Sequence, residues 1–210
     1  MKFSILGSGS SGNSSYIEMG KKKFLIDAGF SGKKTAEKLN NIGRRIEDID
    51  GIFVTHEHSD HIQGLGVISR KYDIPIYLHE ITYGIIREKI GKIDPKNINF
   101  LREDKLSFEE CTVNNFEVMH DAEKCLGFTF EYNNKKLSYA SDVGCTNNII
   151  KENFKNSDVI VVESNYDYNM LMTGPYHWEL KNRVKGRNGH LSNAEASKLI
   201  SQVMSDKLKK

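Results

Sequence analysis

The sequence predicts an α/β fold, because short apolar runs rich in β-branched residues alternate with segments of helical spacing. Residues 52–54 and 159–163 are such runs, and they are typical of strands buried on both faces of a sheet. Between them, apolar side chains recur at Ile62, Leu65 and Ile68, which is the spacing of one helix face. Ligand sites in α/β proteins usually lie just beyond the carboxyl ends of such strands. The residues that follow each run are therefore the first candidates for a functional site.

Length and composition indicate one globular domain. The 210 residues are expected to form a single domain, 1–210, or a tightly fused pair of similar halves. No run reaches the roughly 18 apolar residues of a transmembrane helix, so a soluble protein without membrane contact is predicted. The apolar start of the chain is too short for a signal peptide, which favours a cytoplasmic location. The three cysteines are widely spaced and are expected to be reduced packing residues.

The first predicted element is a strand at residues 2–6, followed by a glycine-rich loop at residues 7–12. The loop has the pattern Gly-x-Gly-x-x-Gly, and Asp27 follows twenty residues after its first glycine, so a dinucleotide-binding fold has to be weighed. That fold requires a helix at the third glycine, whereas residues 14–19 and 23–26 indicate two strands joined by a turn. We therefore predict that the glycines form a tight turn beside the active site.

The densest cluster of chemically active side chains follows the run at residues 52–54. His56, His58, Asp60 and His61 lie within six residues. In an extended segment, residues two apart point the same way, so the first three are predicted to converge on one cavity, with His61 starting the next helix. Imidazole and carboxylate groups suit zinc, manganese or iron, and four such ligands exceed what one catalytic ion uses, which indicates a pair of ions. The alternative is a polar loop that is rich in histidine by chance.

Three further histidines are candidates. His120 continues the inward face of Phe116 and Val118, and it is interpreted either as a metal ligand or as a hydrogen-bonded core histidine. His190 lies in a loop before the capping box that starts the last helix, and its alternative role is to orient that helix. His79 ends another short strand and is expected to be a structural or rim residue.

Residues 127–132 and 136–141 are predicted to form a hairpin around Asn133-Asn134, a favourable pair for a tight turn. Asp142 closes the second strand of this hairpin. Taken alone, it is an ordinary turn aspartate.

A cationic run follows an aromatic segment near the end of the chain. Aromatic residues cluster between positions 166 and 178, and Lys181, Arg183, Lys185 and Arg187 come after them. Aromatic rings stack on bases and cations hold phosphates, so Lys181 and Arg183 are predicted to bind substrate. The alternative is a helix whose aromatic residues pack inward while its cations face water.

The run His56-Glu57-His58-Ser59-Asp60-His61 resembles the His-x-His-x-Asp-His signature of metallo-β-lactamase-fold hydrolases. Segments 8–13, 26–29, 163–165 and 189–192 are similar to the YycJ/WalJ-like group of that family, in the same order along the chain. The resemblance implies a four-layer αβ/βα sandwich. In this fold two mixed sheets lie face to face, with helices on the outer layers and metals at one sheet edge.

The resemblance also implies an activity, metal-assisted hydrolysis of phosphodiester bonds in DNA by an exonuclease-like enzyme. It implies two zinc or manganese ions, with His190 as proton donor, Asp60 as both ligand and catalytic group, and Asp142 as a bridging ligand. True β-lactamases of the fold tend to carry cysteine where Asp142 stands, which counts against antibiotic hydrolysis. Open alternatives are a cyclic or other small phosphodiester, a thioester, and a non-catalytic remnant. The implied ligands are His56, His58, Asp60, His61, His120 and Asp142.

Members of this family usually continue into a last strand that ends in one more histidine ligand. No histidine follows His190 here, so the sequence is expected to lack that strand. The ion on His56, His58 and His120 is then expected to be retained. The site of the second ion is then expected to be completed by His190, by water or by a neighbouring subunit of a homodimer.

Overall fold

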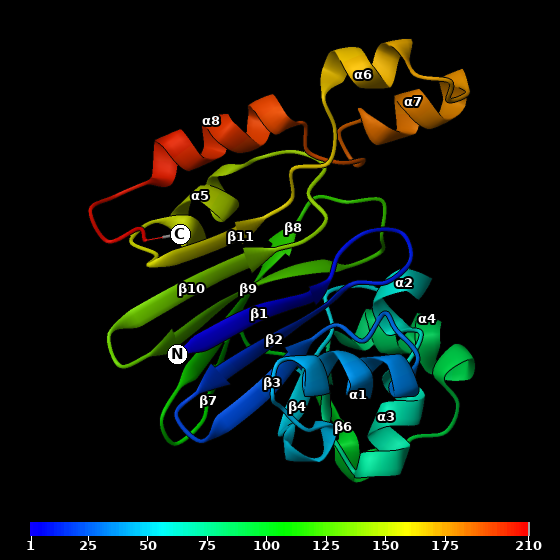
Figure 1. Ribbon diagram of the computed structural model, residues 1–210, viewed down its shortest axis with the longest axis vertical. Helices are drawn as coiled ribbons and strands as arrows, with labels where there is room; N and C mark the ends of the chain where they lie inside the picture. The colour runs from blue at the N-terminus through cyan, green and yellow to red at the C-terminus, as the bar shows by residue number, and fades with distance from the viewer. Residues whose placement is uncertain (210) are drawn as a thin grey trace. The chain divides into compact units, whose positions relative to one another are not determined.

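The computed structural model describes residues 1–209, and its chain divides into two compact units (Figure 1). The first unit comprises Met1–Cys111, and the second begins at Thr112. Each unit contains a mixed sheet and its own helices, in agreement with the predicted fold class. Within residues 1–209, no helix combines the length and the apolar character needed to cross a lipid bilayer.

The first unit is built on a six-stranded sheet with the strand order β1-β2-β3-β4-β5-β6. Strands β1 to β3 are antiparallel, and β3 to β6 run parallel to one another. A loop, not a helix, joins β1 to β2, so the dinucleotide-binding alternative is wrong. Gly9 and Gly12 have φ values of 120° and 143°, which are readily adopted only by glycine. The strands are β1 (Lys2–Gly7), β2 (Ser14–Met19), β3 (Lys22–Ile26), β4 (Gly51–Phe53), β5 (Ile76–Leu78) and β6 (Ile98–Phe100).

Helices of the first unit pack apolar side chains on its sheet. Leu39, Leu65 and Ile86 come from three different helices and join one buried cluster with Leu25 and Ile52 of the sheet. The predicted helical spacing from Ile62 onward is confirmed, although two short helices share it. The helices are α1 (Gly32–Asn41), α2 (Ser59–Ile62), α3 (Leu65–Tyr72) and α4 (Glu80–Ile90), with 3-10 turns η1 (Ile46–Asp48) and η2 (Pro95–Asn97) and a further strand β7 (Lys105–Ser107).

In the second unit, strands run in the order β11-β10-β9-β8. The predicted hairpin is confirmed, because β9 and β10 are antiparallel and Asn133 and Asn134 have φ values of 51° and 58°, as a tight hairpin turn requires. The strand β11 differs from expectation. It lies at the end of this order, and its four residues are only partly buried rather than covered on both faces. The strands are β8 (Thr112–Val118), β9 (Cys125–Tyr132), β10 (Lys135–Ala140) and β11 (Val159–Val162).

Helices α5 (Asn148–Phe154) and α8 (Asn193–Val203) pack on this sheet through a cluster that contains Phe116, Phe154 and Leu199. The predicted capping box at the start of α8 is confirmed, because the hydroxyl of Ser192 accepts from the Glu195 backbone N–H while the Glu195 carboxylate accepts from the Ser192 N–H. Helices α6 (Tyr168–Thr173) and α7 (Trp178–Val184) lie apart from α5 and α8 (Figure 1).

Candidate metal centre

His56 and His58 lie in the segment after β4, and their rings meet edge to face at an interplanar angle of 78°. His56 Nε2 lies 2.9 Å from His58 Nδ1. Two nitrogen ligands of one tetrahedral zinc ion stand about 3.3 Å apart, given Zn–N bonds of about 2.0 Å. The pair therefore already has nearly the spacing that a shared ion requires. The buried His56 ring is also held at its other nitrogen, Nδ1, which lies 2.9 Å from the hydroxyl of Thr55.

Asp60 and His61 lie on α2 and not on an extended segment. The prediction that Asp60 continues the alternation of His56 and His58 is therefore wrong. His58 is the last extended residue, with φ −63° and ψ 144°, and the helix begins at Ser59. Asp60 and His61 instead converge at the side-chain nitrogen of Asn13, which lies 2.9 Å from Asp60 Oδ2 and 3.0 Å from His61 Nε2.

The contact with Asn13 indicates that Asp60 and His61 are placed to bind a cation. Its amide N–H groups, the positive end of a dipole, contact one carboxylate oxygen and one imidazole nitrogen. Those are the two atoms that Asp60 and His61 would offer to a metal ion. The sequence alone does not single out Asn13, because an asparagine in a glycine-rich loop carries no signal of a partner 47 residues away.

Asp27 fixes the orientation and the proton of His61. Its fully buried carboxylate accepts from the backbone N–H and the hydroxyl of Thr55 and lies 2.8 Å from His61 Nδ1. An ionised carboxylate can only accept, so His61 carries its proton on Nδ1 and presents the lone pair of Nε2. This is the usual arrangement behind a histidine that binds metal.

Gly29 allows three loops to meet at this cluster. A Cβ atom at Gly29 would lie 1.7 Å from the carbonyl oxygen of Asp60 and 2.5 Å from the backbone nitrogen of Asn13. Backbone bonds tie the same loops together, since Asn13 N–H donates to Asp60 O and Gly29 N–H donates to Asn13 O. The glycine is therefore a steric requirement of the site.

We expect Asp27→Asn to weaken metal binding about 10- to 100-fold, as the loss of an outer partner of a metal ligand typically does. Asparagine tolerates the left-handed backbone at this position, where φ is 60°. Its amide NH₂ would, however, oppose the proton on His61 Nδ1 or the hydroxyl of Thr55. His61 would then favour the tautomer protonated on Nε2, which has no lone pair for the ion.

Calorimetric titration of the apoprotein with Zn²⁺ or Mn²⁺ measures this effect. Asp73→Asn is the matched control, because Asp73 also has a left-handed backbone, with φ 54°, but is exposed on the surface. Equal metal affinity of the two variants would contradict the role given to Asp27.

In the second unit, His120 and His190 each have one ring nitrogen fixed by a protein acceptor. His120 Nδ1 donates to the carbonyl oxygen of Gly189 at 2.9 Å, and its Nε2 lies 3.1 Å from Asp121 Oδ1. In the neutral ring with the proton on Nδ1, Nε2 carries the lone pair. Burial lowers the pKa of His120, which favours the neutral imidazole that binds metals. His190 Nδ1 lies 2.6 Å from Glu163 Oε1 and 3.6 Å from Asp142 Oδ1. The hydrogen bond to Glu163 raises the pKa of His190 and favours its protonated form.

Glu163 connects the two loops of this cluster. Its second oxygen accepts from the backbone N–H of Val143 at 2.9 Å and from that of Leu191 at 3.1 Å. One carboxylate thus holds the residue after Asp142 and the residue after His190. Asp142, Glu163 and His190 together offer ligand atoms within 4.8 Å of one another. Glu163 is not among the predicted site residues, although it is the last residue of a predicted strand.

The other predicted residues have different surroundings. Lys181 is buried, and its ammonium group donates to the carbonyl of Met172, so it joins α7 to the segment of α6. Arg183 donates through Nε to Asp121 at 2.7 Å and remains largely exposed. His79 caps α4, accepting from the backbone N–H of Ile81 through Nδ1, which agrees with the structural role expected of it.

Comparison with known proteins identifies the family of the chain. Residues 22–208 match the family model described as the beta-lactamase superfamily domain. The whole chain is 41% identical to the exodeoxyribonuclease YycJ of Bacillus anthracis, covering 80% of that protein. It is 38% identical to the exodeoxyribonuclease WalJ of Streptococcus pneumoniae D39, covering 79% of it. YhfI from Bacillus subtilis, a metallo-beta-lactamase fold protein, superposes with a TM-score of 0.72 at 16% identity, covering 96% of this chain and 80% of that one.

The two mixed sheets with their flanking helices and the His-x-His-x-Asp-His segment are those of metallo-β-lactamase-fold hydrolases. The chain belongs to this superfamily and, within it, to the group that contains YycJ and WalJ. The fold implies divalent metal ions. The imidazoles and carboxylates of both units are a fitting donor set for them.

Proposed function

We propose that this protein is a metal-dependent phosphodiesterase that degrades DNA from an end. The observation that carries the proposal is the likeness over the full chain to two relatives named exodeoxyribonucleases, at 41% and 38% identity. The donor chemistry supports it, because imidazole and carboxylate ligands suit zinc and manganese ions. A divalent ion of this kind polarises a phosphoryl oxygen and activates water when bound.

Six side chains would hold the ions. In the first unit, the proposed ligands are the two rings after β4 and the two donors of α2. In the second unit, they are the neutral ring of His120 and the carboxylate that follows β10. The proposed ligands are thus His56, His58, Asp60, His61, His120 and Asp142.

Residues of the chain itself would orient these ligands and move the proton. Asp27 holds His61 with Nε2 as acceptor, and the carbonyl of Gly189 does the same for His120. Glu163 favours the protonated form of His190. Hydrolysis within DNA expels an alkoxide, a poor leaving group that has to be protonated. We propose that His190 supplies this proton from Nε2.

Degradation of end-labelled double-stranded DNA with added Mn²⁺ tests the proposal. We expect progressive shortening that stops when the metal is removed by a chelator and resumes when Mn²⁺ is restored. Intact DNA after reconstitution with both Mn²⁺ and Zn²⁺ would contradict a nuclease function.

A further inference from the structure

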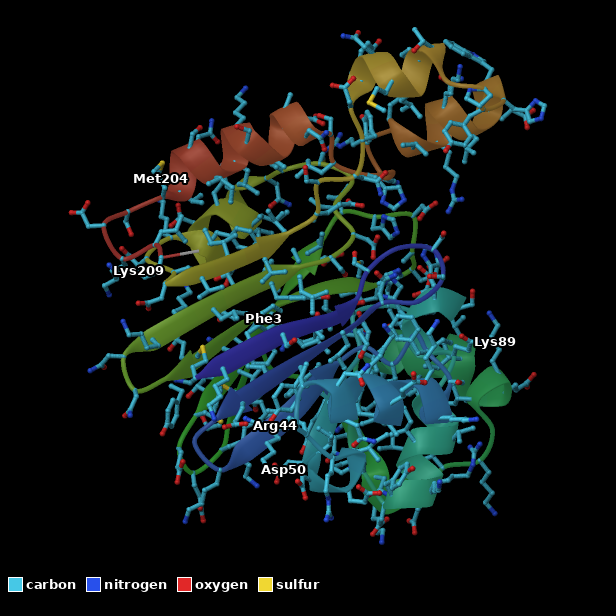
Figure 2. The ribbon with its side chains drawn as sticks, in the orientation of Figure 1. Phe3, Arg44, Asp50, Lys89, Met204 and Lys209 are labelled. Atoms are coloured by element: carbon cyan, nitrogen blue, oxygen red, sulfur yellow. The ribbon has the colours of Figure 1, made fainter. Side chains whose placement is uncertain are left out.

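Three aromatic rings on and between α6 and α7 are exposed. Tyr168 is 55% exposed, Tyr176 is 56% exposed and Trp178 is 60% exposed. The alternative in which the aromatic residues of this segment pack inward therefore does not hold for these three. Figure 2 shows side chains of both helices extending outward from the ribbon. We call Tyr168, Tyr176 and Trp178 the aromatic platform.

Cations lie beside this platform. The Lys185 ammonium group is 5.0 Å from the centroid of the Trp178 ring, within the range of a cation–π contact. Arg183 and Arg187 line a hollow of about 410 Å³ next to Gly186 and Gly189, together with Asp121, whose carboxylate accepts from Arg183 Nε at 2.7 Å. Across residues 166–189, four cations outnumber two acidic residues, and the acids lie outside the cationic run at 181–187. The surface therefore combines flat apolar rings with positive charge.

The hollow is fixed to the catalytic loops of the same unit. The backbone N–H of His190 donates to Val184 O at the end of α7, at 2.8 Å. The carbonyl of Gly189 accepts from His120. The segment at Arg187 can approach the loop that follows Asp142 because residue 144 is a glycine. A Cβ atom at Gly144 would lie 2.3 Å from the carbonyl oxygen of Arg187. A chain that lies in this hollow would thus be held next to His190.

We propose that the aromatic platform and the cations Arg183, Lys185 and Arg187 bind a single strand of nucleic acid and guide it to His190. This inference rests on the proposed nuclease function and names the surface that holds its substrate. Exposed rings bind bases by stacking without regard to sequence, and neighbouring cations bind the phosphates. Lys181 is left out, because its ammonium group is buried.

The chain provides a direct reporter, because Trp178 is its only tryptophan. The protein is titrated with an oligothymidylate of about ten nucleotides. A chelator is present throughout, so that the strand is bound but not hydrolysed. We expect quenching of the tryptophan fluorescence. By anisotropy of a labelled strand, Trp178→Ala and Tyr176→Ala should each weaken binding about tenfold, equivalent to one lost stacking contact.

The salt dependence of binding distinguishes the contribution of the cations from that of the aromatic rings. Lys185→Ala and Arg187→Ala should each reduce the slope of log affinity against log salt by about 0.7, the value for one phosphate contact of a single strand. Met204→Ala and Lys198→Ala are the matched controls and should bind as the wild type does. Both are exposed residues of the second unit at α8, and Figure 2 places Met204 far from α6 and α7.

The outcomes distinguish this inference from the proposed function. Binding that depends on the platform, in a protein that hydrolyses neither DNA nor bis(p-nitrophenyl) phosphate, would support the platform and contradict the nuclease. Active degradation of DNA with binding unchanged in Trp178→Ala and Lys185→Ala would overturn the platform. Quenching by phosphatidylserine vesicles but not by the strand would overturn it as well. So would a dimer that dissociates in Trp178→Ala while strand affinity stays constant.

Discussion

Replacing His58 with alanine is expected to lower DNA hydrolysis by about 100-fold, the upper end of the 10- to 100-fold loss typical for an outer partner, since losing a proposed ligand should cost more than losing its outer partner. His58 Nδ1 lies 2.9 Å from His56 Nε2, so the substitution removes one of two nitrogens that already have the spacing for a shared ion. His58 is also partly exposed, whereas His56 is fully buried. The fold should therefore tolerate alanine in place of His58 better than a change at His56.

Metal content gives a second measurement of this variant, independent of activity. The ratio of bound Zn²⁺ or Mn²⁺ to protein should fall in His58→Ala and stay constant in His79→Ala. His79 is a suitable control because it also follows a short strand of the same unit and starts a helix, α4, where its ring accepts from a backbone N–H. A His58→Ala protein with full metal content and full activity would disprove the role of His58.

The sequence located the histidines because their donors are close together in the chain, directly after a recognisable strand. Local spacing does not reveal partners that the fold supplies from a distance. Asn13 reaches Asp60 across 47 residues, and Glu163 reaches His190 across 27. Neither residue type is diagnostic by itself. Only the close approach of loops that Gly29 permits makes Asn13 part of the cluster.

Two other differences have local physical causes. Asp60 was expected on an extended segment, but the backbone changes to a helix after His58, which rotates Asp60 toward Asn13. The cationic run predicted the charge of this segment but not the direction in which each side chain points. The ammonium group of Lys181 turns inward to Met172, whereas Arg183 stays at the surface beside Asp121. Burial within a pair of short helices depends on their packing, which the spacing of charges does not encode.

Histidine protonation follows one rule in both units. A carboxylate or carbonyl fixes the Nδ1 proton in His61 and His120, and Nε2 is left as the donor atom for a metal. His190 has the same kind of partner in Glu163, but there the short contact also raises its pKa. The chain thus provides two rings whose Nε2 is suited to ligation and one ring suited to hold an additional proton.

That distinction predicts the behaviour of His190→Ala. General acid catalysis contributes roughly 10²- to 10⁴-fold, so hydrolysis of DNA at saturating substrate should fall by about that factor. Hydrolysis of bis(p-nitrophenyl) phosphate should fall far less, because p-nitrophenolate leaves without a proton. Glu163→Gln should show the same contrast in weaker form, since glutamine can still accept from the ring but no longer carries the charge that favours its protonated form. Its NH₂ group would then face the backbone N–H groups of Val143 and Leu191, so thermal stability is measured alongside to separate loss of charge from loosening of the two loops.

Comparison of the two substrates in one preparation separates this role from a structural one. A variant that had lost its fold or its metal would lose both activities to the same extent, whereas loss of the proton donor affects only the poor leaving group. Bound metal measured alongside confirms that the ions remain. An equal loss on both substrates at full metal content would show that His190 acts on binding or on the ions, and would remove it as the proton donor.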